Sequence, residues 1–355
     1  MLAVTAMPAT RENRSIAAWS QDRLDSPVAP ENEPAYYDEA LEAWVLSRHS
    51  DILCALHAPG LAAAGSGDSD TGVKMRAEAV EALNPAQVHR WREELEPECP
   101  ALSAMLRTEA PVDLMAEYAR PLCLALAAIV SGVSRELAHS FEPSARRICV
   151  STADPEDGFL REQARQATEE LGGCFNPGPQ SLREPAFVAL SQTMPCLLGN
   201  AWFGLIEHPR QWSLLHLRPE LTAQAIEELL RYAGLTRTLS RRASSDLDLN
   251  GLTIRAGERV VLGIFAANRD PARFAQPNQV EAIRRDGGHL TLGAGAHACV
   301  AANLIRTIAI AVTLPLVQRF AGAVLGRPVD WQGGSGFRYP KSMWVRFAGS
   351  LRSAG

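Results

Sequence analysis

Two long apolar segments dominate the pattern of hydrophobic and polar positions along this chain. Residues 112–133 and 186–209 are apolar over most of their length, and each predicts a buried helix. The second segment contains Pro195, which lacks a backbone N–H and is expected to kink the helix. Residues 219–233 alternate apolar and polar positions with a helical period, which predicts an amphipathic helix.

Shorter patterns predict the remaining elements. A short strand over 42–47 precedes a helix over 49–58 that is expected to open on a serine cap. The polar, proline-rich residues 135–184 predict only patchy helix, and the sequence Leu-Asn-Gly-Leu at 249–252 predicts a β-hairpin. Other expected elements are helix over 73–95 with a break at 84–85, an apolar helix that ends at Phe320, and strands within 236–243, 247–270 and 336–347. The fold class predicted is mainly α with small β-sheets (α+β).

Domain organisation and composition narrow the kind of protein. A polar arm over 1–35 precedes what we expect to be a single domain over 36–355. The net charge of -5 argues against a nucleic-acid partner. Without a signal peptide or an apolar run long enough to span a bilayer, we expect a cytoplasmic protein with no membrane partner. Seven cysteines with no CxxC spacing indicate a reducing compartment.

One cysteine stands in a distinctive setting. Cys299 follows the turn Gly293-Ala-Gly295-Ala-His297 and precedes an apolar helix. The positive end of that helix is expected to lower the pKa of the thiol, and a thiolate is a soft ligand for iron or a nucleophile. The glycines let the backbone approach a flat partner closely.

Cys299 has three other interpretations. It could be an ordinary core residue, since free cysteines commonly pack as small hydrophobes. Gly293-x-Gly295-x-x-Ala298 is a weak form of the dinucleotide fingerprint, but no repeated βαβ pattern surrounds it and no acidic residue follows at the spacing needed to bind a ribose. A cysteine protease would need a histidine and an orienting residue elsewhere in the fold, and nothing in the sequence supports one.

Four motifs in order resemble the cytochrome P450 family of bacterial soluble haem-thiolate enzymes. The family's loop Phe-Gly-x-Gly-x-His-x-Cys-x-Gly corresponds to 292–301, and its Glu-x-x-Arg helix to Glu228 and Arg231. Arg284 lies where the family completes an Arg–Glu–Arg cluster, and 252–271 matches the family's hairpin. The resemblance implies the cytochrome P450 fold.

The resemblance also implies a cofactor and its site. Haem b would bind with Cys299 as the iron ligand, in a loop that includes Leu292 and Gly293, and with Ala189 on the opposite face. Its propionates would be met by three basic side chains, namely His297, Arg241 and Arg76. Leu292 replaces the family's aromatic residue and Ala301 its last glycine.

The segment expected to cross above the haem departs from the family. The family pattern Ala-Gly-x-Asp/Glu-Thr corresponds to residues 189–193, in which Thr193 survives and Gln192 replaces the acid. A carboxamide does not titrate near neutral pH and cannot relay a proton as an acid does. Leu190 replaces the glycine, and its side chain is expected to crowd the oxygen pocket. The short stretch between Ser134 and Ala189 predicts a shortened F/G lid.

These features leave the reaction open. One hypothesis is a monooxygenase of secondary metabolism that takes electrons from NAD(P)H through a ferredoxin-type donor and acts on a small organic molecule, free or tethered to a carrier. Thr193 and Gln192 would be its catalytic residues. The alternative is other haem-thiolate chemistry, such as peroxide-driven oxidation, oxidative coupling, N–O or nitrene-type reactions or isomerisation, and a third, weaker one is a protein without turnover. A donor surface is expected at four basic residues, Lys74, Arg76, Arg90 and Arg92.

Overall fold

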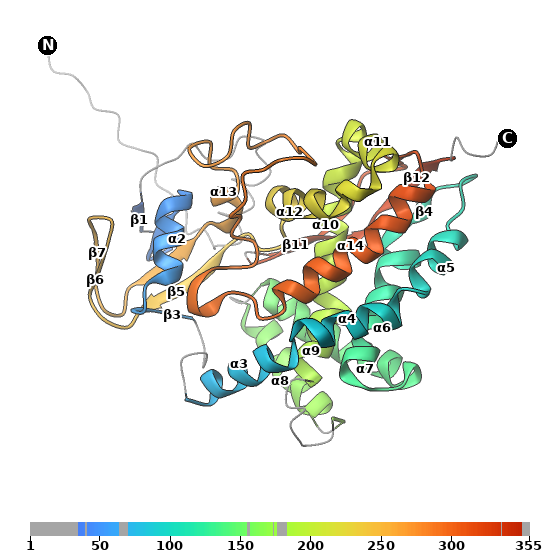
Figure 1. Cartoon of the computed structure of the whole chain (residues 1–355). Helices are drawn as coiled ribbons and strands as arrows, with labels where there is room; N and C mark the ends of the chain where they lie inside the picture. Colours follow the sequence, from blue (N-terminus) through green and yellow to red (C-terminus); the bar gives the residue numbers. More distant parts are fainter. Residues whose placement is uncertain are drawn as a thin grey trace, which may run out of the picture.

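The computed structural model describes residues 35–39, 41–63, 70–154, 157–172, 174–175, 183–334 and 336–349. The predicted arm over 1–35 therefore lies outside the described residues, except for Ala35. Helices form most of the described chain, and the largest sheet lies to one side of them (Figure 1). This arrangement confirms the predicted fold class.

Thirteen α-helices are described, with short π and 3-10 segments between them. The α-helices are α2 (His49–His57), α3 (Asp70–Ala82), α4 (Pro85–Leu95), α5 (Glu98–Met105), α6 (Arg120–Ser131), α7 (Arg135–Ala153), α8 (Gly158–Gly172), α9 (Arg183–Val188), α10 (Met194–Ile206), α11 (Pro209–Leu217), α12 (Thr222–Ala233), α13 (Ile264–Ala267) and α14 (Ala302–Arg319). The other segments are the π-helices η2 (Met115–Ala119) and η3 (Ala189–Thr193) and the 3-10 turns η4 (Pro219–Leu221) and η5 (Gly295–His297).

The strands form four small sheets. The largest has the order β1-β2-β8-β5-β3, with the other sheets ordered β4-β12-β9, β10-β11 and β6-β7. The strands are β1 (Tyr36–Asp38), β2 (Ala43–Leu46), β3 (Leu61–Ala63), β4 (Val112–Asp113), β5 (Leu239–Ala243), β6 (Leu247–Leu249), β7 (Leu252–Ile254), β8 (Arg259–Leu262), β9 (Gly322–Leu325), β10 (Asp330–Gly333), β11 (Arg338–Ser342) and β12 (Trp344–Ala348). The predicted hairpin is confirmed, because Asn250 and Gly251 both have positive φ, at 55° and 85°, between β6 and β7.

Each π-helix ends two residues before a proline. Pro121 and Pro195 are the second residues of α6 and α10, which continue directly from η2 and η3. A proline nitrogen cannot donate to the carbonyl four residues earlier and its ring pushes that carbonyl away, so the preceding turn widens. The interruption predicted at Pro195 thus takes the form of a π turn, in which the N–H of Met194 donates to the carbonyl of Ala189.

Two local predictions were wrong. The region 135–184 holds the long helices α7 and α8, which pack against each other and bury apolar faces in spite of Pro143 within α7. Helix α2 has no serine cap: Arg48 occupies the N-cap position, and the N–H of His49 instead donates to Asp270 Oδ2 at 2.9 Å. For α2 a tertiary contact supplies the cap that the local sequence lacks, whereas α7 and α8 carry an amphipathic helical period that the prolines and polar composition obscure.

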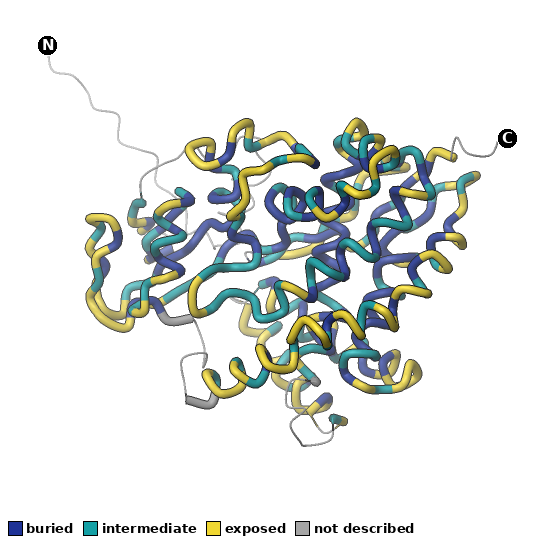
Figure 2. Tube along the Cα trace, in the orientation of Figure 1, coloured by how far each residue is buried: buried dark blue, intermediate teal, exposed yellow. Residues whose placement is uncertain are grey.

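The main core lies between the helices, and Figure 2 shows it as a continuous buried interior. Helix α14 is fastened to α10 by Trp202 Nε1, which donates to Thr313 Oγ1 at 2.9 Å. The hydroxyl of Tyr118 in η2 donates to the carbonyl of Val312 in α14 at 2.8 Å. These buried bonds fix the helix that follows the cysteine loop relative to the helix that follows η3.

A smaller core lies beneath the five-stranded sheet and includes residues of α2 and β8. No single helix in the described ranges has the length and apolar character needed to cross a membrane. One pair, Met115–Ser131 with Arg135–Ala153, meets that requirement only when the two are taken together, and they are bent at 108°.

Candidate functional site

The cysteine loop is a tight, hydrogen-bonded turn that delivers Cys299 to the start of α14. The N–H of Cys299 donates to the carbonyl of Leu292 at 2.7 Å, and the N–H of Gly293 donates to Leu290 at 2.9 Å. Gly293 and Gly295 have φ of 71° and 66°, a region that favours glycine. A Cβ on Gly295 would lie 2.4 Å from the carbonyl oxygen of Leu56, so the loop rests directly on α2.

The electrostatics of Cys299 differ from the prediction. Burial raises the pKa of the half-buried thiol and outweighs the lowering by the Ala301 N–H, Arg76 and Arg306. The predicted lowering of the pKa was therefore wrong for the polypeptide alone, because desolvation penalises the anion more than its neighbours stabilise it. A metal cation at the sulfur would supply the missing charge, and a single thiolate on a glycine-rich turn is the donor that haem iron takes in this class.

Of the three predicted propionate partners, Arg76 contacts the cysteine loop from another element, His297 is part of the loop, and Arg241 lies on a strand. Arg76 in α3 donates from Nη2 to the carbonyl of Ala298, next to Cys299. His297 is half-buried at the end of η5, within the loop itself. Arg241 is a half-buried residue of β5, paired in register with Val260 of β8, and its Nη1 donates to the carbonyl of Ser240 at 2.9 Å.

The segment predicted to face the oxygen side lies in the π-helix η3. Ala189 is exposed and Gln192 and Thr193 are half-buried, although the flanking helices are largely buried. Leu190 is instead buried in the main core. The Gln192 carboxamide has Ser191 Oγ at 3.4 Å from its nitrogen. The open side of η3 therefore presents the alanine, the carboxamide and the threonine.

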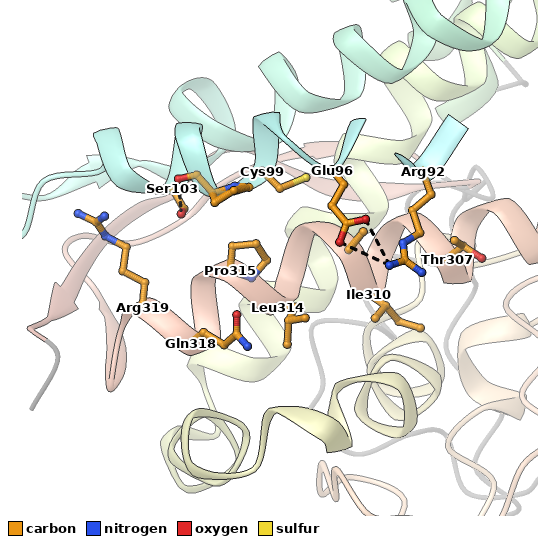
Figure 3. Close-up of a pocket in the computed structure, with 12 residues that line it drawn as sticks. Arg92, Glu96, Cys99, Ser103, Thr307, Ile310, Leu314, Pro315, Gln318 and Arg319 are labelled. Atoms are coloured by element: carbon orange, nitrogen blue, oxygen red, sulfur yellow. Dashed lines mark hydrogen bonds and ion pairs between the residues drawn. The ribbon is translucent and has the colours of Figure 1, made fainter. Parts of the chain in front are cut away.

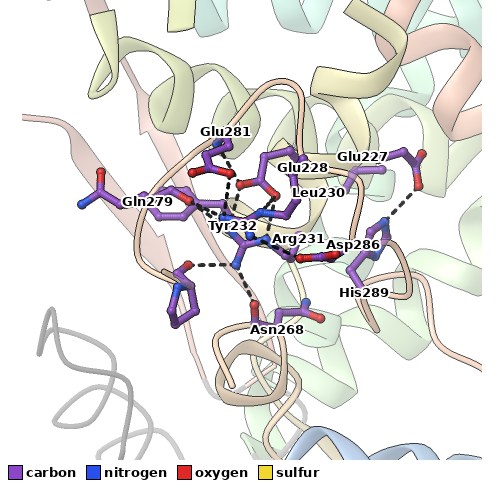
Figure 4. A network of polar contacts seen from close by, with 12 residues as sticks. Glu227, Glu228, Leu230, Arg231, Tyr232, Asn268, Gln279, Glu281, Asp286 and His289 are labelled. Carbon is purple, nitrogen blue, oxygen red and sulfur yellow. Dashed lines mark hydrogen bonds and ion pairs between the residues drawn. The ribbon is translucent and has the colours of Figure 1, made fainter. Parts of the chain in front are cut away.

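The predicted Arg–Glu–Arg cluster is confirmed and is buried. Glu228 Oε2 lies 2.7 Å from Arg231 Nε and 3.0 Å from Arg284 Nε. Arg231 Nη1 also donates to the carbonyl of Asn268 at 2.8 Å (Figure 4). The guanidinium of Arg231 thereby has partners on every side, as a buried charge requires.

Beside this cluster lies a second ionic group that sequence reasoning missed. Glu227 accepts from Arg306 Nε at 2.6 Å. It also lies 3.4 Å from His289 Nε2 (Figure 4). The pKa of Glu227 falls to about 2, chiefly because of His289. Burial opposes this shift, and Arg306 adds to it. Because Arg306 also lowers the pKa of Cys299, this group connects α12 to the cysteine loop. Its only sequence signal was a glutamate adjacent to Glu228.

Comparisons with known proteins agree with this geometry. The cytochrome P450 family model matches residues 210–324. Nocardicin C N-oxygenase from Nocardia uniformis subsp. tsuyamanensis is 29% identical over 360 residues, which cover 86% of this chain and 89% of that enzyme. Cytochrome P450 105C1 from a Streptomyces species is 31% identical over 249 residues, which cover 64% of this chain and 65% of that protein.

The solved structure of P450BioI in complex with an acyl carrier protein ligated to hexadec-9Z-enoic acid has the same fold. Its TM-score is 0.79 at 21% sequence identity, over 93% of this chain and 97% of that one. Helix order, sheet arrangement and the cysteine loop thus define an oxidoreductase of the P450 class. The chain belongs to the cytochrome P450 family.

Proposed function

We propose that this enzyme is a haem-thiolate oxidative tailoring catalyst that binds haem b through Cys299. The observation that carries the proposal is the cysteine loop itself, with two left-handed glycines, one thiol and Arg76 on the adjoining carbonyl. Arg76, Arg241 and His297 would bind the haem propionates, and Leu292 and Gly293 would line its cysteine side. When bound, such a haem supplies the activation of oxygen or peroxide.

The residues of this chain on the oxygen side would position water and would not themselves relay a proton. Thr193 offers a hydroxyl that can donate to and accept from an ordered water or the substrate. Gln192 offers a carboxamide, which holds a hydrogen bond but releases no proton near neutral pH. We therefore place the proton supply in ordered water held by Thr193, with Gln192 fixing its orientation.

The reaction proposed first is monooxygenation of a small organic molecule in secondary metabolism. The nocardicin relative is an N-oxygenase, and the P450BioI structure contains an acyl carrier protein, which supports a substrate that is free or carrier-tethered. The second candidate is non-monooxygenase chemistry, such as peroxide-driven oxidation, coupling, N–O or nitrene-type reactions or isomerisation. Gln192 at the acid position favours it.

The iron ligand is tested by the carbonyl adduct of the reduced protein. We expect the full chain to bind one haem and to give the absorption typical of a thiolate ligand. Cys299→Ser should abolish that absorption, whereas Cys54→Ser, at another half-buried cysteine, should retain it. Absorption like that of a histidine-ligated globin in the unaltered protein would contradict the proposal.

The two reaction candidates are separated at Gln192. If the enzyme is a monooxygenase, restoring the acid with Gln192→Glu should raise oxygen-coupled turnover. We expect a rise of roughly 10²-fold, which is the low end of what general acid–base catalysis contributes. The measurement is NADH consumption and product formed with a surrogate ferredoxin, compared with peroxide-driven turnover. Unchanged oxygen-coupled turnover, with peroxide-driven turnover dominant in both proteins, would favour the second candidate.

An electron donor would dock on the groove between α4–α5 and the middle and end of α14. This groove has a volume of about 670 Å³, with Arg92 and Arg319 near its two ends (Figure 3). Apolar side chains, including Ile310 and Leu314, line its floor. Arg92 is one of the predicted donor-surface residues, and α14 leads from this groove to Cys299.

A further inference from the structure

A second cavity lies away from the candidate site, between α10, the end of α12 and the β10–β11 hairpin. Its volume is about 260 Å³. Three arginines line it, Arg237, Arg269 and Arg338, and no acidic side chain lies among the described residues that line it. Neither the cysteine loop nor η3 contributes to this lining. We call it the Arg269 pocket.

Arg269 carries a charge that the described residues do not neutralise. Its Nη1 donates to Asn278 Oδ1 at 3.0 Å and its Nη2 to the carbonyl of Tyr232 at 3.1 Å, both neutral acceptors. Its buried Nε has no hydrogen-bond partner within the described part of the chain. Burial lowers the pKa of Arg269, and the charge of Arg231 adds to this. A buried guanidinium without a carboxylate is costly, and an anion in the pocket would offset that cost.

The arginines are held in place by aromatic rings. Arg269 lies 4.2 Å from the ring centre of Tyr232 and 4.4 Å from that of Phe265. Arg338 lies 4.5 Å from the ring centre of Trp331. Cation–π contacts orient a guanidinium, and for Arg269 they add no carboxylate beside its charge. The pocket walls are thus preorganised for anion recognition.

The same walls favour a ligand with an apolar body. Phe203 meets Trp331 edge to face, with ring centres 4.9 Å apart, and both line the pocket. Asn200, only 6% exposed, donates from Nδ2 to the carbonyl of Arg338 at 2.7 Å. Its buried Oδ1 has no partner among the described residues. The volume is below the roughly 300 Å³ at which ordinary ligand pockets begin, so it suits one small ring.

We propose that the Arg269 pocket binds a small organic anion, a carboxylate or phosphate monoester on a compact apolar or aromatic body. This site is separate from the proposed haem site and does not depend on the chemistry proposed there. The guanidiniums recognise the anionic group and the aromatic side chains recognise the body. Inorganic phosphate, which lacks the body, should bind more weakly.

The test is calorimetric titration of the full-chain holoenzyme in a buffer free of phosphate and carboxylates. Benzoate, phenyl phosphate and inorganic phosphate serve as probes, and the first two distinguish a carboxylate ligand from a phosphate monoester. We expect one organic anion per chain, bound without a shift of the haem band and about tenfold or more tighter than inorganic phosphate. Equal affinity for phenyl phosphate and inorganic phosphate would overturn the proposed ligand class.

Two arginines that stack on tryptophans provide the matched pair of variants. Arg338→Gln should weaken binding about tenfold, the effect of losing one charge-assisted hydrogen bond. Arg327→Gln should leave it unchanged, because Arg327 stacks on Trp344 at 4.3 Å but does not line the pocket. If Arg338→Gln lowers the melting temperature, Arg269→Gln tests the opposite wall. No binding of either organic anion, or equal binding by Arg338→Gln and Arg327→Gln, would refute the site.

Discussion

The side chains around Glu228 show how buried charges are compensated in the interior of this protein. Glu228 and Arg231 are 3% and 2% exposed, yet every contact that would compensate them is present, including the N–H of Glu281 at 2.9 Å from Glu228 Oε1. Removing one member of such a group costs about 3–5 kcal/mol, because the others are left as buried, unpaired charges. We therefore assign Glu228 and Arg231 a positioning role, in which they hold the loop over 268–284 behind α12.

Glu227, unlike the buried Glu228, is partly exposed to solvent, and it makes a pH-dependent contribution to the stability of the fold. Its carboxylate is about half-exposed, and its pKa is lowered from 4.5 to about 2, first by His289 and then by Arg306. A lowered folded-state pKa means stability that is present above pH 4.5 and is lost as pH falls toward 2. We expect Glu227→Gln to reduce the free energy of unfolding at pH 6 by about 1 kcal/mol, after allowance for solvent screening.

The check on Glu227 is urea unfolding of the holoenzyme between pH 6 and pH 3. The difference between the unaltered protein and Glu227→Gln should shrink steadily as the pH falls through this window. Glu94→Gln, at an exposed carboxylate of α4, should show no such trend. A difference between the unaltered protein and Glu227→Gln that stays constant with pH would mean that the carboxylate charge is not what stabilises this group.

Elements whose signal lies in a short stretch of the sequence were predicted well. Features that depend on packing between elements were not. The β6–β7 turn needs only Asn250 and Gly251, and α12 carries its helical period in its own residues. The amphipathic period of α7 and α8 is obscured by the prolines and polar composition of 135–184, and their packing joins residues such as Arg147 and Glu170, 23 positions apart, which no short pattern reveals. The same holds for Cys299, whose burial depends on the whole fold and reverses the pKa shift expected from its helix terminus.

The contact between the cysteine loop and α2 gives a prediction for one glycine. Gly295→Ala places a Cβ 2.4 Å from the carbonyl of Leu56 in a left-handed conformation, so the loop must shift. Such strain costs of order 1–3 kcal/mol. We expect a lower melting temperature and reduced haem content, measured on protein expressed with excess haem precursor. Gly287→Ala, where nothing lies within 4 Å of the added Cβ, is the matched control and should leave both unchanged.

At the scale of the whole molecule, the groove beside α14 is where we propose that an electron donor docks. The chain carries a net charge of -5, so long-range attraction of an acidic donor must come from a local basic surface. The groove beside α14 has an arginine toward each end and an apolar floor, an arrangement typical of a weak, transient interface. Arg92 is paired with Glu96 at 3.3 Å, across an exposed contact that is worth little in water. A docking donor can therefore displace Glu96 at small cost.

This reasoning predicts how electron transfer responds to salt and to charge reversal. The rate of reduction by a ferredoxin-type donor should fall as ionic strength rises from about 0.01 M to 0.15 M, because the Debye length shortens from about 30 Å to 8 Å. Arg92→Glu should slow reduction about tenfold at low salt through slower association, since charges at an interface act mainly on the on-rate. Arg146→Glu reverses a charge of the same kind, paired with Glu142 at 2.9 Å on α7 and outside the groove, and should have little effect. Reduction that is independent of salt, or equally slowed by both variants, would place the donor on another face of the molecule.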